Sequence, residues 1–342
     1  MISLKKLVLL SPVLIPFSLV GCRSEIPASG NSTTTYQDPS IIVPVGRLKS
    51  PRGIAVDPSG DIWVSDSYSN AVRRISPGGS DKTLLTAIPF PTKMGFDRST
   101  NNILVTIEQN TLLSISPSND VTNIVFSFSG SVIDTASVFD VTTGIQTSRI
   151  INSLTIGDVD GAANGDLFVS ALANDAENFL IRVRNGIATA IAFSPLRPTS
   201  QSERTSHFLS TDQFGDVYTS FVTGVGASGT TTNLFAIVPG NLPASQRFSN
   251  IRITPTAQGS GIDATGRLFI AEPSLQQVVL VSTADSSPTD FIILPFIQGM
   301  SAPTPRDVAL APNGDIYVAV SDFLDTSNTL GAVIMYKRNP SL

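Results

Sequence analysis

The 342-residue chain contains one cysteine, Cys22, and one histidine, His207. A single cysteine excludes an intramolecular disulfide and a metal site built from several thiolates. A single histidine leaves no set of imidazoles for a zinc site and no histidine pair for acid–base catalysis. Charged residues make up only 14% of the chain, compared with about 25% in an average soluble domain. We therefore expect no cofactor that depends on Cys or His clusters.

Basic residues are also scarce, because 22 Lys and Arg stand against 27 Asp and Glu. Nucleic acids and anionic lipid headgroups both select clustered Lys and Arg, so neither is expected as a binding partner. The sequence also lacks an apolar run of full transmembrane length at its N-terminus. The stretch from Leu7 to Val20 has about 14 residues, whereas a membrane-spanning helix needs about 20.

The N-terminus has the order of segments that is typical of an export signal. Lys5 and Lys6 precede the apolar stretch, which ends in Leu19-Val20-Gly21-Cys22. These last four residues resemble the lipobox of bacterial lipoproteins, and the resemblance implies cleavage after Gly21 and lipidation of Cys22. Several acyl chains on one residue anchor a protein stably to a membrane. The alternatives are an ordinary secretory signal with a chance cysteine, or an uncleaved anchor.

We therefore expect three segments: a signal peptide over residues 1–21, the lipidated cysteine with a flexible tether over residues 22–40, and one domain over residues 41–342. Residues 23–40 are rich in Ser and Thr and lack apolar periodicity, which is typical of a tether. Arg23 differs from the Asp that retains lipoproteins in the inner membrane of enteric bacteria. The resemblance thus implies a location in the cell envelope, at the outer membrane if the organism is Gram-negative.

One six-residue pattern recurs along the chain and determines the expected fold. Its copies are Gly60–Ser65, Asn101–Thr106, Gly165–Ser170, Gly215–Ser220, Gly266–Ala271 and Gly314–Ala319, with starts 41, 64, 50, 51 and 48 residues apart. A short apolar strand precedes each copy, and one or two further strands follow it. Four short antiparallel strands repeated about every 50 residues describe the blades of a propeller.

The repeats predict an all-β fold, a six-bladed β-propeller of four-stranded antiparallel blades. The sixth unit ends after three strands, so we expect Ile41–Val45 to pair beside Ala332–Tyr336 and close the ring. Most first strands end in an acid, such as Asp57, Asp97 or Asp160, which we expect to cap the following hairpin turn. The aromatic residue at the fourth position of most copies is expected to fill the core between blades.

The first repeat resembles an NHL repeat. The landmarks are Pro51–Asp57, Gly60–Asp66 and Asn70–Ile75; Pro305–Val318 in blade six also matches well, and blades two to five match more loosely. The resemblance implies a propeller of the NHL or gluconolactonase-like superfamily. It implies no single function, because such propellers include scaffolds, ligand binders and enzymes.

The expected binding surface is the face of the ring that carries the connections between second and third strands and between blades. Long segments fall there: Ala171–Asn178, Val222–Asn233, Val320–Gly331 and the insertion Gly130–Ser153. One position near the start of each first strand is polar in every blade, and we expect it to form a ring at the mouth of the central channel. The ring consists of Arg52, Thr92, Thr155, His207, Gln258 and Arg306. Such a ring suits an anionic or hydroxyl-rich ligand; the alternative is a polar rim without a ligand.

We therefore expect a non-catalytic binding or scaffold propeller, attached to the membrane through the lipid on Cys22, that engages an envelope protein or glycan with its long-loop face. No catalytic residue is predicted. The alternative is a divalent-metal-dependent hydrolase of the lactonase type, since gluconolactonase propellers hold a cation such as Ca²⁺ on the axis. The acids considered for that cation are Asp66, Glu108, Asp158 and Glu272, although they lack the arrangement of that family.

Overall fold

The computed structural model describes residues 36–339, except residues 109, 130–132, 175, 198–207, 227–228, 240–246, 284–287 and 328. The predicted signal peptide, Cys22, most of the tether and His207 lie outside the described residues. Two short 3-10 helices, η1 (Ser67–Ser69) and η2 (Pro273–Leu275), are the helical elements of the described part. No helix in that part is long and apolar enough to cross a lipid bilayer.

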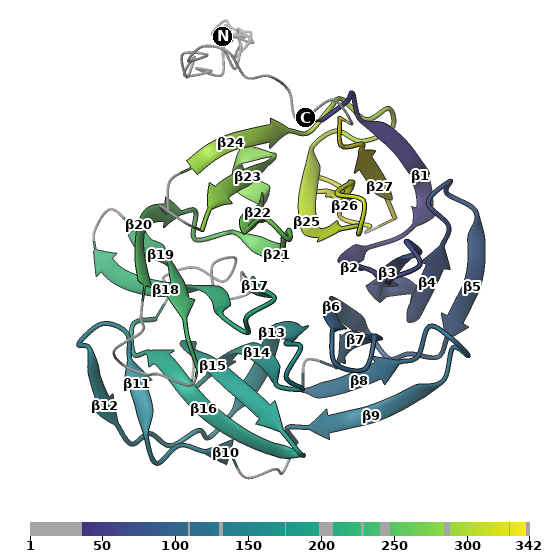
Figure 1. The fold of residues 1–342 in the computed structure, drawn as a ribbon. Helices are drawn as coiled ribbons and strands as arrows, with labels where there is room; N and C mark the ends of the chain where they lie inside the picture. The colour runs from purple at the N-terminus through teal and green to yellow at the C-terminus, as the bar shows by residue number, and fades with distance from the viewer. Residues whose placement is uncertain are drawn as a thin grey trace, which may run out of the picture. The chain divides into compact units, whose positions relative to one another are not determined.

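The fold contains six antiparallel groups of four strands, which we call blades one to six. Blades two and three are joined by one parallel bridge between Asp97 and Gly161, and three further short strands extend blade three. From the innermost strand outward, blades one to three are β2 (Pro51–Val56), β3 (Ile62–Asp66), β4 (Ala71–Ile75), β5 (Asp81–Thr86); β6 (Pro91–Asp97), β7 (Asn102–Ile107), β8 (Thr111–Ile115), β9 (Thr122–Ser127); and β13 (Leu154–Gly161), β14 (Leu167–Ala173), β15 (Glu177–Arg184), β16 (Ile187–Ser194). Blades four to six are β17 (Leu209–Thr211), β18 (Val217–Gly226), β19 (Gly229–Ile237), β20 (Arg247–Ile253); β21 (Gln258–Ile262), β22 (Arg267–Glu272), β23 (Gln277–Ser282), β24 (Pro288–Ile293); and β25 (Pro303–Leu310), β26 (Ile316–Asp322), β27 (Gly331–Tyr336), β1 (Ser40–Leu48). Figure 1 shows the blades around a central axis, each with its first strand innermost.

The ring is closed in the way that the sequence predicts. First strands of neighbouring blades contact one another in an unbroken cycle, β2–β6–β13–β17–β21–β25–β2. β1 supplies the outermost strand of blade six and pairs antiparallel with β27, from Ser40 opposite Met335 to Leu48 opposite Gly331. Pro44 falls within a register shift of this pair, where a missing N–H is tolerated. The prediction of an all-β propeller closed by an N-terminal strand is therefore confirmed.

The two faces of the ring carry different connections. Hairpins between first and second strands and between third and fourth strands lie on what we call the turn face, and the other connections lie on the loop face. The chain enters the ring on the turn face, where the Gln37 N–H donates to the Lys337 carbonyl (2.9 Å) and Tyr36 pairs with Arg338. β1 then runs from the turn face to the loop face.

The turn acids act as the sequence predicts in four blades. Asp57 Oδ1 accepts hydrogen bonds from the backbone N–H groups of Ser59 (2.9 Å) and Asp61 (3.1 Å). Gly60 in this turn has a φ of 87°, a conformation that glycine adopts without strain. The equivalent acids of blades two, four and five are Asp97, Asp212 and Asp263.

The turn of blade three begins two residues later than the sequence pattern predicts. Ala162 takes the place of Asp57, because its N–H donates to the Asp166 carbonyl (2.8 Å) as the Asp57 N–H donates to that of Asp61. Asp160 instead lies within β13, and its carboxylate accepts hydrogen bonds from the backbone N–H of Thr211 (2.8 Å) in blade four. The prediction of Asp160 as a turn acid was therefore wrong.

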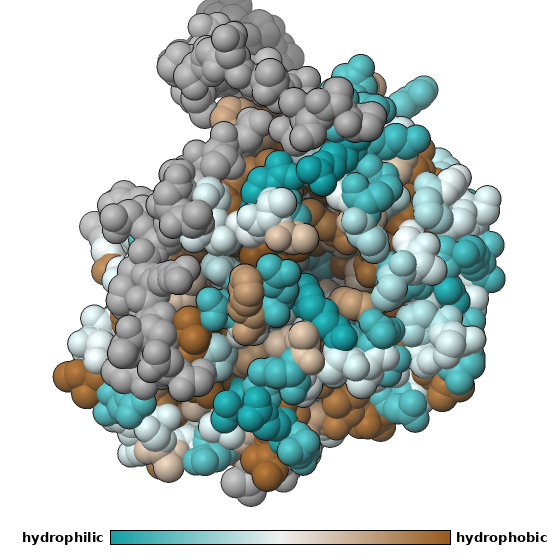
Figure 2. All heavy atoms as spheres, in the orientation of Figure 1, coloured by the Kyte–Doolittle hydropathy of each residue, from teal (hydrophilic) through white to brown (hydrophobic). Residues whose placement is uncertain are grey.

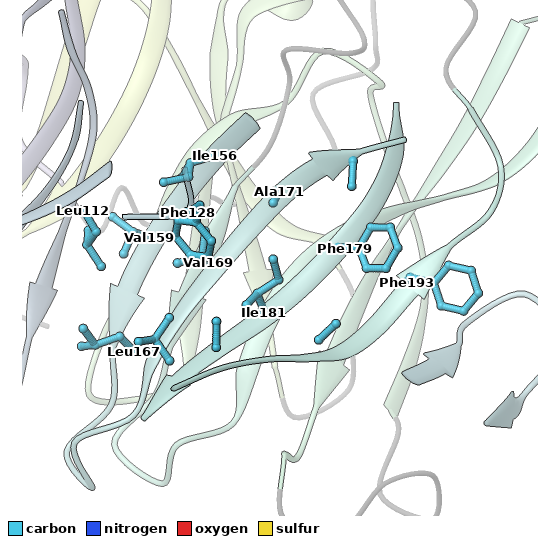
Figure 3. Packing of buried hydrophobic residues seen from close by; sticks show 14 of the residues in the cluster. Leu112, Phe128, Ile156, Val159, Leu167, Val169, Ala171, Phe179, Ile181 and Phe193 are labelled. Carbon is cyan, nitrogen blue, oxygen red and sulfur yellow. The ribbon is translucent and has the colours of Figure 1, made fainter. Parts of the chain in front are cut away.

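The core consists of six apolar clusters in the described structure, one between each pair of neighbouring blades. Figure 3 shows the cluster that joins Leu112 and Phe128 of blade two to Val169 and Ile181 of blade three. The aromatic residues of the repeats are all at most 4% exposed, as predicted: Trp63, Phe168, Tyr218, Phe269 and Tyr317. Because each cluster needs two blades, no blade buries its apolar faces alone.

The predicted long loops contain strand to different extents. In Ala171–Asn178, β14 and β15 pair as far as Ala173 opposite Glu177. In the insertion before blade three, β10 (Ile133–Asp134) and β11 (Val138–Asp140) pair in parallel with β16, and β12 (Ile145–Thr147) pairs with β11. Phe139 of β11 is buried in the cluster between blades three and four. The segment Val222–Asn233 continues the β18–β19 ladder as far as Gly226 and Gly229. The insertion thus widens blade three and contributes to the core.

Candidate functional site

Two arginines occupy equivalent positions at the loop-face ends of neighbouring innermost strands. Arg52 lies within the register shift of β2 in blade one, and Arg306 lies within the matching shift of β25 in the neighbouring blade six. Burial and then the positive charge of Arg52 lower the pKa of Arg306 to about 10. Burial also lowers the pKa of Arg52. Two partly buried guanidinium groups therefore share one small region.

Within the described residues, most N–H donors of these two arginines have no hydrogen-bond acceptor. The Arg52 guanidinium lies over the Phe90 ring, 5.4 Å from its centroid, and the Phe90 ring packs edge-on against Tyr68 at 5.9 Å. Arg306 Nε donates to Ser321 Oγ (2.5 Å). Within the described part of the chain, neither arginine forms an ion pair with a carboxylate.

Three charged residues form a layer one position deeper in the channel. Asp307 Oδ2 accepts a hydrogen bond from the Ile54 N–H of the next blade (3.0 Å), and Asp158 Oδ2 accepts one from the Leu209 N–H of the next blade (2.8 Å). Lys93 Nζ donates to the carbonyl of Arg306 (2.8 Å). The two acids occupy equivalent positions in opposite blades, so each ties its own first strand to the following one.

The pKa values of this axial layer reflect its burial. Burial raises the pKa of Asp307 to about 6, although the charge of Lys93 acts in the opposite direction. Burial, followed by the charge of Asp307, raises the pKa of Asp158 well above its usual range, again against Lys93. The charge of Lys93 thus faces these two carboxyl groups, whose oxygens are already bonded to backbone N–H groups.

The other residues of the predicted ring are placed differently. Thr92 is buried, with its Oγ1 2.6 Å from that of Thr106. In blade three the late turn places Gly157, and not Thr155, at the register of Arg52. Gln258 pairs with Ala271 at the start of β21, and His207 lies outside the described residues. The structure therefore brings together the two arginines of the ring rather than a uniform polar circle.

Two acids considered as metal ligands instead cap backbone at the loop face. Asp66 accepts hydrogen bonds from the N–H groups of Lys49 (3.1 Å) and Ser50 (2.9 Å). Glu272, at the equivalent place in blade five, accepts one from the Thr254 N–H (3.2 Å) and one from the Thr254 hydroxyl. Each acid thereby fixes the connection that leads into its own blade.

The four candidate metal ligands lie in separate environments. Glu108 is exposed in the turn after β7, Asp158 is on the axis, and Asp66 and Glu272 lie at the ends of second strands. Across the described residues, no group of three or more His, Cys, Asp or Glu side chains is arranged to hold a metal ion. The described residues near the axis are carboxyl groups with hydrogen-bond partners, together with Lys and Arg side chains. They do not form a cluster of carboxylates that could coordinate a metal ion.

The burial of Glu272 leads to a prediction about pH. Burial raises its pKa to about 8, and the hydrogen bond from the Thr254 N–H opposes this. Between a pH of about 4.5 and 8 the folded protein then holds a proton that the unfolded chain has released, so the free energy of unfolding falls as the pH rises. Glu272→Gln keeps an oxygen acceptor and removes the buried charge. We expect this variant to be more stable than the wild type at pH 8.5, by an amount on the order of 2 kcal/mol, and similar to it at pH 5.

Urea unfolding of the full-length protein at both pH values measures this difference. Glu177→Gln is the matched control, because Glu177 is also buried but has an ion-pair partner in Arg149 (2.7 Å). The control is expected to lose stability at both pH values. Equal stability of wild type and Glu272→Gln at pH 8.5 would contradict the assigned proton.

Five exposed apolar side chains lie on the loop face of blades five, six and one. They come from η1, η2, the connection between blades five and six, and the β26–β27 loop: Tyr68, Leu275, Phe296, Phe323 and Leu324. Phe296 is 85% and Phe323 is 70% exposed. The Phe323 N–H donates to the Ala302 carbonyl (2.9 Å), so the two connections that carry these rings are bonded together. We call this set the apolar arc; it flanks Arg52 through Tyr68 and Phe90, and Arg306 through Ser321.

A small cavity lies among the innermost strands, on the turn-face side of the axial layer. A cavity of about 100 Å³ toward the turn face is lined by first-strand residues of all six blades, among them Ala55, Gly95, Ser210 and Gly261. These small side chains allow the first strands to converge, and Figure 2 shows the hollow at the centre of the ring. A space of this size admits a few water molecules, so a larger ligand would have to bind at the surface.

The fold and this mouth define a β-propeller with a cationic, loop-face entrance to its channel. Residues 48–75 match the family model of the NHL repeat. No curated protein matches the sequence. Among solved structures, the chain is similar to a gluconolactonase from Xanthomonas campestris, with a TM-score of 0.60 and 11% identity over 88% of this chain and 89% of that one.

Two further solved structures are similar. The calcium-binding protein regucalcin from Agrobacterium tumefaciens has a TM-score of 0.57 and 12% identity over 87% of this chain and 96% of its own. A streptogramin B lyase has a TM-score of 0.56 and 11% identity over 89% of this chain and 98% of its own. At these identities the likeness concerns the fold.

Sequence reasoning missed several residues of this region. Lys93 follows Thr92 directly, but a single lysine in an apolar strand gives no sign that it faces an axis. The exposed rings of the apolar arc occur in connections without a repeat pattern, so their shared face follows only from the ring. The detectable signal was the pair of arginines, since Arg52 and Arg306 occupy one position of the repeat in adjacent blades.

Proposed function

We propose that this chain is a non-catalytic binding protein of the cell envelope that engages a protein partner through the loop face of its propeller. The observation that carries the proposal is the apolar arc beside Arg52 and Arg306. Large solvent-exposed apolar patches mark interaction sites, and aromatic residues with Arg are the residue types that dominate the binding energy of protein interfaces. A protein partner suits this surface better than a glycan, because the arc combines aliphatic and aromatic side chains.

The proposal includes the anchor. The lipobox resemblance supports lipidation of Cys22 and a place in the envelope, at the outer membrane of a Gram-negative cell. The entry of the chain at Tyr36 and Gln37 on the turn face supports a partner on the loop face, because the apolar arc belongs to the opposite face of the ring from these two residues.

The test is to replace exposed rings of the arc in the full-length protein within the native envelope. We expect Phe296→Ser with Phe323→Ser to reduce partner crosslinking by about ten-fold or more, because truncation of hot-spot rings costs about 2 kcal/mol. Phe214→Ser is the matched control, since this ring is 81% exposed but lies on the turn face. Equal loss in both variants, or no loss in either, would contradict a loop-face interface.

The metal-dependent lactonase is the alternative function. The gluconolactonase structure shares this fold, and the test for its chemistry is elemental analysis of the purified full-length protein with thermal unfolding before and after chelation. Near-stoichiometric divalent metal and a lower melting temperature after chelation would favour the hydrolase over the binding protein.

A further inference from the structure

The mouth of the channel carries positive charge that the described structure does not neutralise. Arg52 and Arg306 are both partly buried, and they lie at matching register shifts of β2 and β25, two innermost strands that contact each other. Bringing two like charges together in a partly desolvated site is unfavourable unless an anion joins them. The surrounding contacts are an aromatic ring and a serine hydroxyl, and neither supplies negative charge.

Asp158 and Asp307 of the axial layer already have hydrogen-bond partners. Asp158 and Asp307 each accept backbone N–H groups of their own and the following blade. Lys93, which is 7% exposed, is the cation that faces them. In the described structure neither acid forms an ion pair with Arg52 or Arg306, and the hydrogen bonds of both acids go to backbone N–H groups.

The geometry also leaves suitable donors free. Arg306 uses its Nε atom on Ser321, and no hydrogen bond to a described residue occupies its two terminal nitrogens. Arg52 forms no hydrogen bond to a described residue, and the Phe90 ring supports one flat side of its guanidinium. Planar N–H forks match the two oxygens of a carboxylate, and such bidentate pairs are among the strongest hydrogen-bonded contacts in proteins.

We propose that Arg52 and Arg306 form a carboxylate-binding site that receives an Asp or Glu side chain of the protein partner. This proposal rests on the proposed loop-face function and specifies which chemical group of the partner binds there. The rings of Tyr68 and Phe90 border the site and lead to the apolar arc. The partner segment therefore combines an acidic residue with apolar neighbours.

The probe is an acetylated and amidated pentaglutamate peptide, titrated against the full-length protein in detergent micelles by calorimetry. We expect saturable binding that weakens with added salt, and no binding of the matching pentaglutamine peptide. Arg52→Gln and Arg306→Gln are each expected to weaken the affinity by about ten-fold or more, since a hydrogen bond to a charged group contributes about 1.5–3 kcal/mol, which is ten-fold or above. Arg182→Gln is the control; this partly buried arginine lies in β15, away from the axis, and its loss should leave the affinity unchanged.

Further variants keep the result unambiguous. Arg52→Lys retains the charge without the planar fork and should bind more weakly than the wild type but better than Arg52→Gln. If Arg306→Gln fails to fold, Arg52→Gln carries the test, because Arg52 makes no hydrogen bond to a described residue. Pentaglutamate binding that is equal in wild type and Arg52→Gln would overturn the site.

Two outcomes separate this site from the proposed function. An oligogalacturonate that binds in an Arg52-dependent manner while pentaglutamate does not would overturn the proposal in favour of an acidic glycan. Absence of peptide binding, together with partner crosslinking that still requires Phe296 and Phe323, would reject the carboxylate site and leave the loop-face interface intact.

Discussion

A chain that begins at Lys49, and so lacks β1, is expected to lose the cooperative unfolding of the propeller. Val43 and Leu48 of β1 are at most 1% exposed and belong to the cluster between blades one and six. Burial of two such side chains contributes about 3–6 kcal/mol, and the ladder with β27 adds about 0.5–1.5 kcal/mol for each hydrogen bond. This is a large part of a typical stability of about 5–15 kcal/mol. Urea and thermal unfolding, followed by circular dichroism, measure the loss.

The control for this truncation is a chain that begins at Gln37, which retains β1 and lacks Cys22 and most of the predicted tether. It should unfold in one transition at the position of the full-length protein. A synthetic peptide of residues 37–49 should restore part of the stability of the shorter chain, because the edge of β27 remains available for pairing. If the two chains melt at the same temperature, β1 does not hold the ring closed.

Replacement of Asp307 by Ala is expected to destabilise the protein by about 3–5 kcal/mol, the usual effect of removing one partner from a buried charged group. The substitution leaves the buried N–H of Ile54 without its acceptor and removes one of the two carboxyl groups that face Lys93. The substitution weakens the contact between blades six and one, where the ring is closed. Urea unfolding at pH 7 measures the change.

Two comparisons identify the cause. Asp307→Asn keeps an oxygen for the Ile54 N–H and is expected to recover part of the lost stability. Lys93→Met combined with Asp307→Ala should cost less than the sum of the single changes, because the cation no longer lies opposite a missing charge. Additive effects in this cycle would show that Lys93 and Asp307 do not interact.

Much of the fold could be predicted because each blade repeats one hairpin chemistry. Glycine at positive φ, an acid that caps its own turn and an apolar strand on either side leave a recurring local pattern, as at Asp57–Gly60. The closing strand was predictable for a different reason: the last repeat lacked a strand, and the segment before the first repeat had no other partner.

The predicted turn of blade three was wrong because the sequence there allows the strand to end at more than one residue. Asp158-Val159-Asp160 contains two acids at the end of a strand, and a tertiary contact, the hydrogen bond from Thr211, decides that Asp160 belongs to the strand and not to the turn. The insertion before blade three looked like a loop because its strands are two or three residues long. These short strands form because the outer edge of β16 pairs with β10 and β11, and β11 in turn pairs with β12.

The candidate site was predictable only in part. The repeat placed Arg52 and Arg306 at one position of adjacent blades, and ring closure makes those blades neighbours. Periodicity alone could not show that Asp66 and Glu272 cap the incoming connections, since an acid at a strand end suits a ligand and a cap equally well. Burial and the identity of the bonded N–H groups separate these two roles.

The position of β1 has a mechanical consequence for the proposed arrangement, with a lipid on Cys22 and a protein partner on the loop face. In that proposal, a load between the two attachment points would enter the ring at Tyr36 and run along β1. The hydrogen bonds between antiparallel strands are perpendicular to the strands, so this pull acts on the β1–β27 ladder in shear and distributes the force over many bonds at once. A pull perpendicular to β1 would instead break these hydrogen bonds one after another from one end of the strand. The closing strand would therefore resist a pull along its own axis with several hydrogen bonds at once.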